Sequence, residues 1–111
     1  MIEQGDLLLV PFPFSDQSGR KIRPVVVISN SKFNEFSNDL IVVGVTSNIS
    51  RDKYTLGLGN NDLDEGKLIS DWYIKVESIL KIDKSIIIKK IGKLNIKKLS
   101  KIKEIINFII D

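Results

Sequence analysis

Short runs of apolar and β-branched residues, separated by polar turns, recur along most of this chain. The run at 25–28 is wholly apolar and the run at 40–45 is interrupted only by a glycine, a pattern typical of strands buried on both faces. Clusters of glycine, asparagine and aspartate, such as the one at 59–62, mark turns between the runs. The strands expected from this pattern are residues 7–12, 25–28, 40–45, 54–58, 67–73, 78–82 and 86–91.

The last segment has a helical period. Its apolar side chains recur at intervals of three and four residues, at Leu99, Ile102, Ile106 and Ile109. This spacing predicts an amphipathic helix with Asn95 as its N-cap, and a single helical turn is expected within 30–37. Short strands, one terminal helix and no strand–helix–strand alternation predict one mainly β domain over residues 1–111, a small barrel with a C-terminal α-helix.

The chain has 111 residues and contains neither cysteine nor histidine. Without cysteine there is no disulfide and no thiolate metal site, which fits a reducing compartment. Without histidine the chain lacks the commonest metal ligand and the commonest general acid or base. No phosphate-cradling or dinucleotide-binding glycine motif is present either. We therefore expect no metal site and no cofactor, so any chemistry must come from basic, acidic, hydroxyl or backbone groups.

Charge is unevenly distributed along the chain. Residues 1–80 carry 8 Lys/Arg and 11 Asp/Glu, a net of −3, whereas residues 81–111 carry 9 Lys and 3 Asp/Glu, a net of +6. A basic C-terminal third suits a nucleic acid or an acidic protein, and it equally suits solvation of a helix and edge strands. The start of the chain has no basic stretch and no apolar run approaches the roughly 20 residues that span a bilayer, so we expect a cytoplasmic protein without a membrane segment.

The dipeptide Arg23-Pro24 stands directly before the apolar run at 25–28. Proline is expected at the mouth of a buried strand, because the first strand residue can forgo its N–H. A permanently charged, fork-shaped guanidinium at the same place suits a phosphate. Arg23 is therefore a candidate phosphate ligand, with a solvated surface charge as the alternative.

Together with other segments, this dipeptide resembles the MazF/PemK family of toxin endoribonucleases. The matching segments are residues 5–10, 23–29, 40–47, 71–79 and 91–94, so the resemblance spans nearly the whole chain. The resemblance implies an SH3-like β-barrel with a C-terminal helix, as in MazF, PemK and CcdB proteins, and a homodimer. It also implies metal-independent cleavage of single-stranded RNA at short motifs, and inhibition by a cognate antitoxin whose acidic, disordered tail covers the RNA groove.

Two residues match the catalytic positions of the family: Arg23 of the Arg-Pro motif, and Thr46, the hydroxyl residue that ends the third strand. RNA cleavage without metal or histidine proceeds by attack of the substrate's own 2′-OH, which gives a 2′,3′-cyclic phosphate and a 5′-OH. An acid five residues before the catalytic arginine is common in the family, but Ser18 stands there, and Asp16 is the nearest acid. Asp16 is a candidate base or a residue that orients Arg23, with a turn-forming role as the alternative. Candidate RNA-binding residues are Phe14, Ser18, Arg20, Lys21 and Ser47.

Two other functions compete with the ribonuclease. One is a CcdB-like toxin that binds a protein through its last helix, which we expect to present no exposed aromatic side chain. The other is a catalytically silent RNA-binding barrel, motivated by the missing glutamate before Arg23. RNA cleavage that depends on Arg23 identifies the ribonuclease. Toxicity that survives Arg23→Ala but is lost on truncating residues 100–111 identifies the protein-binding toxin, and salt-sensitive RNA binding without cleavage identifies the silent barrel.

Overall fold

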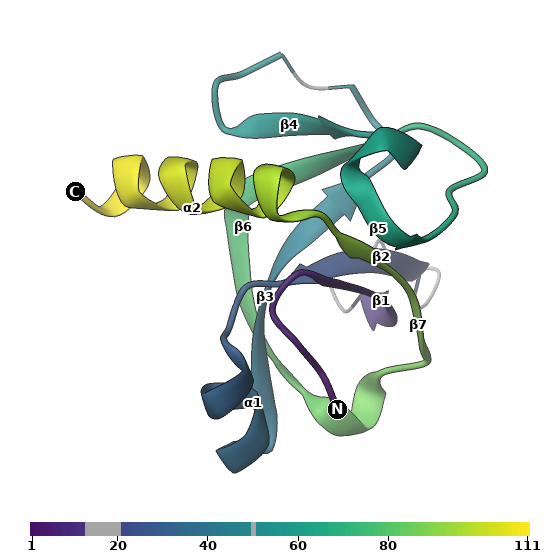
Figure 1. Ribbon diagram of the computed structural model, residues 1–111, viewed down its shortest axis with the longest axis vertical. Coiled ribbons are helices and arrows are strands. Elements are labelled where there is room, and N and C mark those ends of the chain that lie inside the picture. The colour runs from purple at the N-terminus through teal and green to yellow at the C-terminus, as the bar shows by residue number, and fades with distance from the viewer. Residues whose placement is uncertain (13–20, 50) are drawn as a thin grey trace.

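The computed structural model describes residues 1–12, 21–49 and 51–111 of the chain. Seven strands lie within these residues: β1 (Asp6–Phe12), β2 (Lys21–Val27), β3 (Asp39–Thr46), β4 (Thr55–Leu58), β5 (Leu63–Gly66), β6 (Trp72–Asp83) and β7 (Lys89–Leu94). They form a curled sheet in the order β4-β6-β3-β2-β1-β7-β5, antiparallel at every pairing (Figure 1). The expected mainly β fold with a terminal helix is confirmed, and the sheet is a half-barrel.

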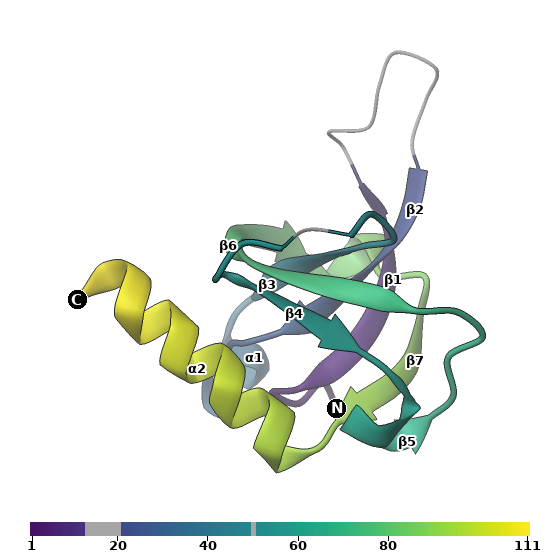
Figure 2. The ribbon, with the colours of Figure 1, turned by 90° about the horizontal axis from the view of Figure 1, so that it is seen from above.

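The same residues hold two α-helices and two 3₁₀ turns: α1 (Ser31–Phe36), α2 (Ile96–Ile110), η1 (Asn60–Asp62) and η2 (Lys84–Ile86). Helix α2 has the predicted N-cap, because the side chain of Asn95 accepts a hydrogen bond from the backbone N–H of Lys98 at 2.9 Å. Its C-terminal turns extend beyond the sheet (Figure 2). Phe108 on these turns is 61% exposed, so the expectation of no exposed aromatic on this helix is wrong. No helix in this part of the chain is long and apolar enough to cross a bilayer.

Both faces of the sheet carry apolar side chains, because successive strand residues point to opposite faces. The core beneath α2 is built around Leu7, Val26, Val43, Val45, Ile74, Val76 and Ile102 of the helix. The core on the other face contains Leu8, Val10, Val25, Val27, Leu40, Val42 and Ile82. On this second face the buried apolar row ends at Val25 in β2 and at Val42 in β3. The next residues that point to this face are Arg23 in β2, and Gly44 and Thr46 in β3. The apolar core therefore gives way to polar side chains on the remaining part of that face.

Strand β6 differs most from the sequence expectation. Residues 67–71 are irregular, so the expected strand 67–73 is wrong except for its last two residues. Those two residues begin β6, which continues without a break through the expected strand 78–82. Every second residue from Trp72 to Val76 packs into the core beneath α2, and no turn residue follows. The chain therefore stays extended through this segment. One twelve-residue strand therefore stands where the sequence pattern predicts two.

The other end of the sheet is also shifted. Strand β7 covers Lys89–Leu94 instead of 86–91, because the side chain of Asp83 accepts from the backbone N–H of Ser85 at 2.8 Å and starts the 3₁₀ turn η2. Strand β5, which the sequence analysis missed, has a polar sequence and pairs only with β7 in the described sheet. Gly66, at φ +88°, crosses so close to Gly92 that a Cβ would lie 2.2 Å from a backbone oxygen.

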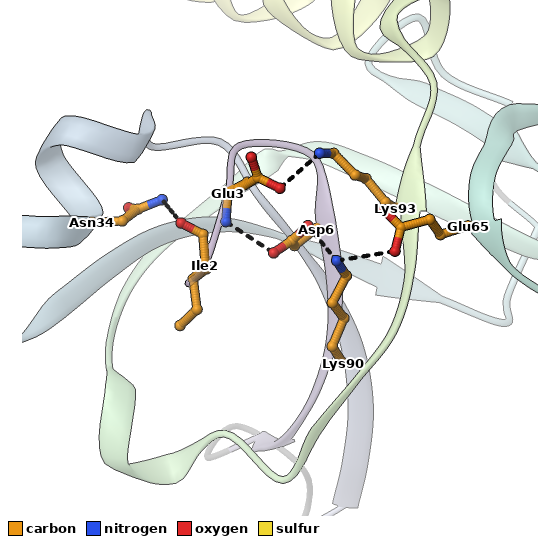
Figure 3. A network of polar contacts seen from close by, with 7 residues as sticks. All are labelled: Ile2, Glu3, Asp6, Asn34, Glu65, Lys90 and Lys93. Carbon is orange, nitrogen blue, oxygen red and sulfur yellow. Dashed lines mark hydrogen bonds and ion pairs between the residues drawn. The ribbon is translucent and has the colours of Figure 1, made fainter.

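A polar network ties the N-terminus to β7 (Figure 3). Asp6 is 1% exposed; its Oδ2 accepts from the backbone N–H of Glu3 at 2.9 Å, and Lys90 Nζ lies 3.3 Å from its Oδ1. Lys90 also lies 3.4 Å from Glu65 of β5. Glu3 in turn pairs with Lys93 at 2.9 Å, and this hydrogen bond lowers the pKa of Glu3 and raises that of Lys93.

Candidate active site

Arg23 and Thr46 face one another across a separation between β2 and β3. These strands pair over three positions only, and the last pair toward the site is Val25 with Gly44. Extending the same register by two residues places Arg23 opposite Thr46. The two side chains therefore share one face of the sheet but lie just past the end of the ladder that aligns them.

Pro24 explains why the ladder stops there. Ile28 donates its backbone N–H to Ile41 of β3 at 2.9 Å, so its amide faces β3. Amide directions alternate along a strand, which places the nitrogen of Pro24 on the same side as that of Ile28. Because proline has no N–H, it cannot extend the bonding to β3, and the pairing of β2 with β3 ends at Val25.

The Arg23-Pro24 dipeptide lies inside strand β2, not before it as the sequence suggested. Strand β2 begins at Lys21, and Pro24 pairs with Leu9 of β1. Pairing with β1 continues beyond the point where pairing with β3 ends, so Arg23 sits on a strand supported from one side only. This placement fixes the Arg23 backbone while leaving its β3 side open.

The opening between the strands is a cavity of about 140 Å³. Its walls come from β2, β3 and β6 and are formed by Arg23, Gly44, Val45, Thr46, Lys75 and Ser78. At about 30 Å³ per water molecule, this volume corresponds to roughly five waters, which suits a single phosphate group better than a whole nucleotide. Two cationic and two hydroxyl side chains therefore surround a space of phosphate size.

A bulge in β6 supplies the two residues that sequence reasoning missed. Val43 pairs with Ile79 and the next residue, Gly44, pairs with Lys75, so three residues of β6 have no partner on β3. Within this bulge, the N–H of Val76 donates instead to the carbonyl of Tyr54 at 3.1 Å. The bulge brings Lys75 and Ser78 to the same cavity, an arrangement that strand periodicity alone does not predict.

The side chains in the cavity have defined partners. Thr46 is 8% exposed, and its hydroxyl oxygen accepts from the backbone N–H of Asn48 at 3.1 Å. This bond uses a lone pair and leaves the hydroxyl proton for a ligand oxygen. Lys75 pairs with Glu77 at 3.3 Å, with both side chains about one-third exposed, so the pair is solvent-screened and the ammonium can exchange to an anion at little cost.

The remaining predicted site residues lie elsewhere or outside the described residues. Ser47 is exposed just after β3 and does not line the cavity, and Lys21 is exposed at the start of β2. The other four candidates fall within residues 13–20, outside the described part of the chain: Phe14, Asp16, Ser18 and Arg20. Within residues 1–12, 21–49 and 51–111, no acidic cluster that could hold a metal ion is present.

The sequence matches the family of PemK-like, MazF-like toxins of type II toxin–antitoxin systems over residues 3–110. It is also 32% identical, over 110 residues, to an endoribonuclease MazF from Staphylococcus saprophyticus, an alignment that covers 96% of this chain and 89% of that protein. The chain belongs to this toxin family and is a homologue of endoribonuclease MazF.

Solved structures share the fold at low sequence identity. An endoribonuclease from a mycobacterial species in complex with its cognate antitoxin superposes with a TM-score of 0.81 at 14% identity, covering 99% of this chain and 95% of that chain. A MazE–MazF complex from Deinococcus radiodurans gives a TM-score of 0.80 at 16% identity, covering 98% and 95%. The architecture is thus that of the MazF toxins.

Proposed function

We propose that this toxin is a metal-independent endoribonuclease that cuts single-stranded RNA at a short sequence motif and uses Arg23 and Thr46 to hold the scissile phosphate. The observation that carries the proposal is the cavity in which Arg23, Thr46 and Lys75 converge on a space of phosphate size. The two residues expected from the family resemblance come from different strands, yet they line this one cavity. Family membership and the endoribonuclease relative support the same activity.

The reaction needs no group outside the RNA for its nucleophile. The 2′-oxygen forms a bond to phosphorus, the bond from phosphorus to the 5′-oxygen breaks, and the products are a 2′,3′-cyclic phosphate and a 5′-OH. One proton leaves the 2′-OH and one reaches the 5′-oxygen. Arg23 donates charge-assisted hydrogen bonds to the non-bridging oxygens, where negative charge increases in the transition state, and Thr46 donates one further bond.

Arg23 acts in this mechanism by electrostatic stabilisation. A guanidinium stays protonated near neutral pH and does not surrender a proton, so it is a poor general acid or base. Water or a nearby side chain then carries the protons. Lys75 adds a second positive charge at the cavity wall and Ser78 adds a second hydroxyl.

The partners of this chain follow from the same site. An acidic antitoxin segment would place carboxylates where RNA places phosphates, near Arg23 and Lys75. The related mycobacterial and Deinococcus structures were solved with their antitoxins, which supports such a partner here. The exposed apolar end of α2, with Phe108 and Ile110, supports pairing with a second copy of the chain in the cytoplasm.

The test is cleavage of a long RNA in EDTA by wild-type protein and by the Arg23→Ala and Thr46→Ala variants. We expect cleavage at a recurrent motif, cyclic-phosphate ends, and a rate loss of roughly 10²–10³ for each variant. Arg51→Ala is the matched control, because it removes an arginine outside the cavity lining. No cleavage by wild type, or undiminished cleavage by Arg23→Ala, contradicts the proposal.

One observation favours a second candidate, a toxin that binds a protein through α2 as CcdB does. The exposed Phe108 near the end of the helix is the kind of side chain such contacts use. Growth arrest that survives Arg23→Ala but is lost in Phe108→Ser would select this function over the ribonuclease.

A further inference from the structure

A second cavity lies next to the cavity at Arg23, one strand further along the sheet. Thr46 of β3 pairs with Tyr73 of β6, and Tyr73 pairs in turn with Gly57 of β4. Side chains of directly opposed residues share a face, so Tyr73 stands on the same face as Thr46, one strand spacing of about 4.8 Å away. A group bound between Arg23 and Thr46 is therefore within reach of a neighbour resting on Tyr73.

Gly57 leaves the far side of Tyr73 open. A Cβ placed on Gly57 would meet nothing within 4 Å, so the position next to the tyrosine is empty space. A cavity of about 240 Å³ opens there and is lined by Tyr73, Trp72, Gly57 and Gly59 among others. Trp72 packs against the core beneath α2, so this end of β6 is held in place while Tyr73 remains partly exposed.

The charges of the two cavities are opposite. The first contains Arg23 and Lys75, whereas Asp71 lines the second. A carboxylate disfavours a phosphate and accepts hydrogen bonds from the amino and imino groups of a nucleobase edge. The first cavity thus suits an anion, and the second suits a neutral planar ring with donors on its edge.

We infer that Tyr73, beside the open position at Gly57, is a stacking platform for the nucleobase next to the phosphate held by Arg23 and Thr46. The inference rests on the proposed function and extends it to a base subsite. Bases stack on aromatic side chains in most sites that bind single-stranded RNA, and such stacking tolerates any base because every base has a π-face. Binding of single strands, and the register of the chain in the site, then depend on this ring.

The probes are fluorescein-labelled 2′-O-methyl 12-mers of each single base, which lack the attacking hydroxyl, and a 12-mer of the same backbone without bases. Fluorescence anisotropy in EDTA gives their dissociation constants for wild type and variants. We expect Tyr73→Ala to bind the base-bearing 12-mers about 5- to 150-fold more weakly and the base-free 12-mer equally well. Tyr73→Phe restores binding, because the ring and not the hydroxyl does the stacking.

Two further variants make the result independent of folding defects. Tyr54→Ala removes the other tyrosine of the chain, whose ring centroid lies 6.3 Å from that of Phe108 on α2, and leaves binding unchanged. Gly57→Val fills the open position with a residue that suits a strand, and it weakens binding of base-bearing probes without removing Tyr73. Thermal unfolding of each variant checks that the fold is intact.

Equal binding of base-bearing 12-mers by wild type and Tyr73→Ala overturns the inference, as does an equal loss for the base-free 12-mer. Absence of binding to any base-bearing probe by wild type also overturns it. Because the probes cannot be cleaved, a failure of RNA cleavage rejects the proposed function without altering this result.

Discussion

Arg23 and Thr46 are aligned by a ladder that ends before it reaches them. The register of β2 and β3 places the two residues opposite each other, and Pro24 withholds the N–H that would bond the strands together at that point. The cavity between them is thus a gap in strand pairing at a fixed position. Its depth and width depend on how far the ladder extends.

The first prediction concerns the shape of the cation at position 23. Arg23→Lys keeps the charge but loses the planar fork that holds two phosphate oxygens at once. We expect it to cleave RNA at least tenfold more slowly than wild type, and faster than Arg23→Ala. Initial rates in EDTA on one long RNA measure this. Wild-type rates in Arg23→Lys would mean that charge alone is sufficient.

The second prediction separates the hydroxyl of Thr46 from its shape. Thr46→Val is nearly isosteric but has no donor, so we expect a rate loss of roughly 10²–10³, as for removal of one donor from an oxyanion site. Thr46→Ser keeps the hydroxyl and is expected to stay within about tenfold of wild type. Similar rates for both variants would assign Thr46 a packing role.

The third prediction tests Pro24 as the residue that opens the cavity. Pro24→Ala restores an N–H facing β3, which allows the ladder to extend toward Arg23 and narrow the gap. The added hydrogen bond and the greater freedom of the unfolded chain oppose each other, so stability should change by no more than about 1 kcal/mol. We expect slower RNA cleavage with a melting temperature within about 5 °C of wild type, together with slow hydrogen exchange of the new amide. Full activity with fast exchange would contradict this explanation.

Most of the sheet is predictable from the sequence because its strands are continuous apolar runs bounded by polar turns, as at Leu7–Val10 and Val25–Val27. Strand β5 is not predictable, since its polar residues are held by pairing with β7 and by the close approach of Gly66 to Gly92. Of the residues that line the cavity, Arg23 and Thr46 follow from their motifs. Lys75 does not, because the bulge that brings it to the cavity depends on pairing between distant segments.

The fourth prediction concerns the buried carboxylate of Asp6. Desolvation, the largest single effect on Lys90, lowers its pKa, but hydrogen bonding and attraction to Asp6 and Glu65 together exceed it, so the pKa of Lys90 is raised. Lys90→Met leaves the Asp6 charge buried with less compensation, which we expect to lower the free energy of unfolding by about 2 kcal/mol. Urea unfolding measures this, with Lys89→Met as the control because it removes an equal charge from the exposed neighbour. An equally large loss of unfolding free energy in Lys89→Met would assign the effect to the net charge of the protein instead of to Asp6.

The fifth prediction is the pH dependence of the Glu3–Lys93 pair. The pKa of Glu3 is lowered from 4.5 by its bond to Lys93, so the folded state favours the ionised carboxylate. Its stabilising effect is fully present above pH 4.5 and is lost as the pH falls through the lowered value. We therefore expect Glu3→Gln to melt below wild type at pH 7 and to converge with it in acid. A difference that persists at pH 2 would exclude titration of Glu3 as the cause.

The bulge in β6 also makes this strand unusually sensitive to changes in length. Its two parts pair with β3 in registers that differ by the three residues between Lys75 and Ile79. After deletion of one residue there, β6 cannot keep both its hydrogen bonds to β3 and the orientation of its side chains. A register shift of one residue moves every side chain of the shifted part to the opposite face of the sheet. Substitutions within 76–78 should therefore be tolerated far better than single-residue deletions, which would turn Lys75 toward the core beneath α2 and Ile74 toward the phosphate cavity.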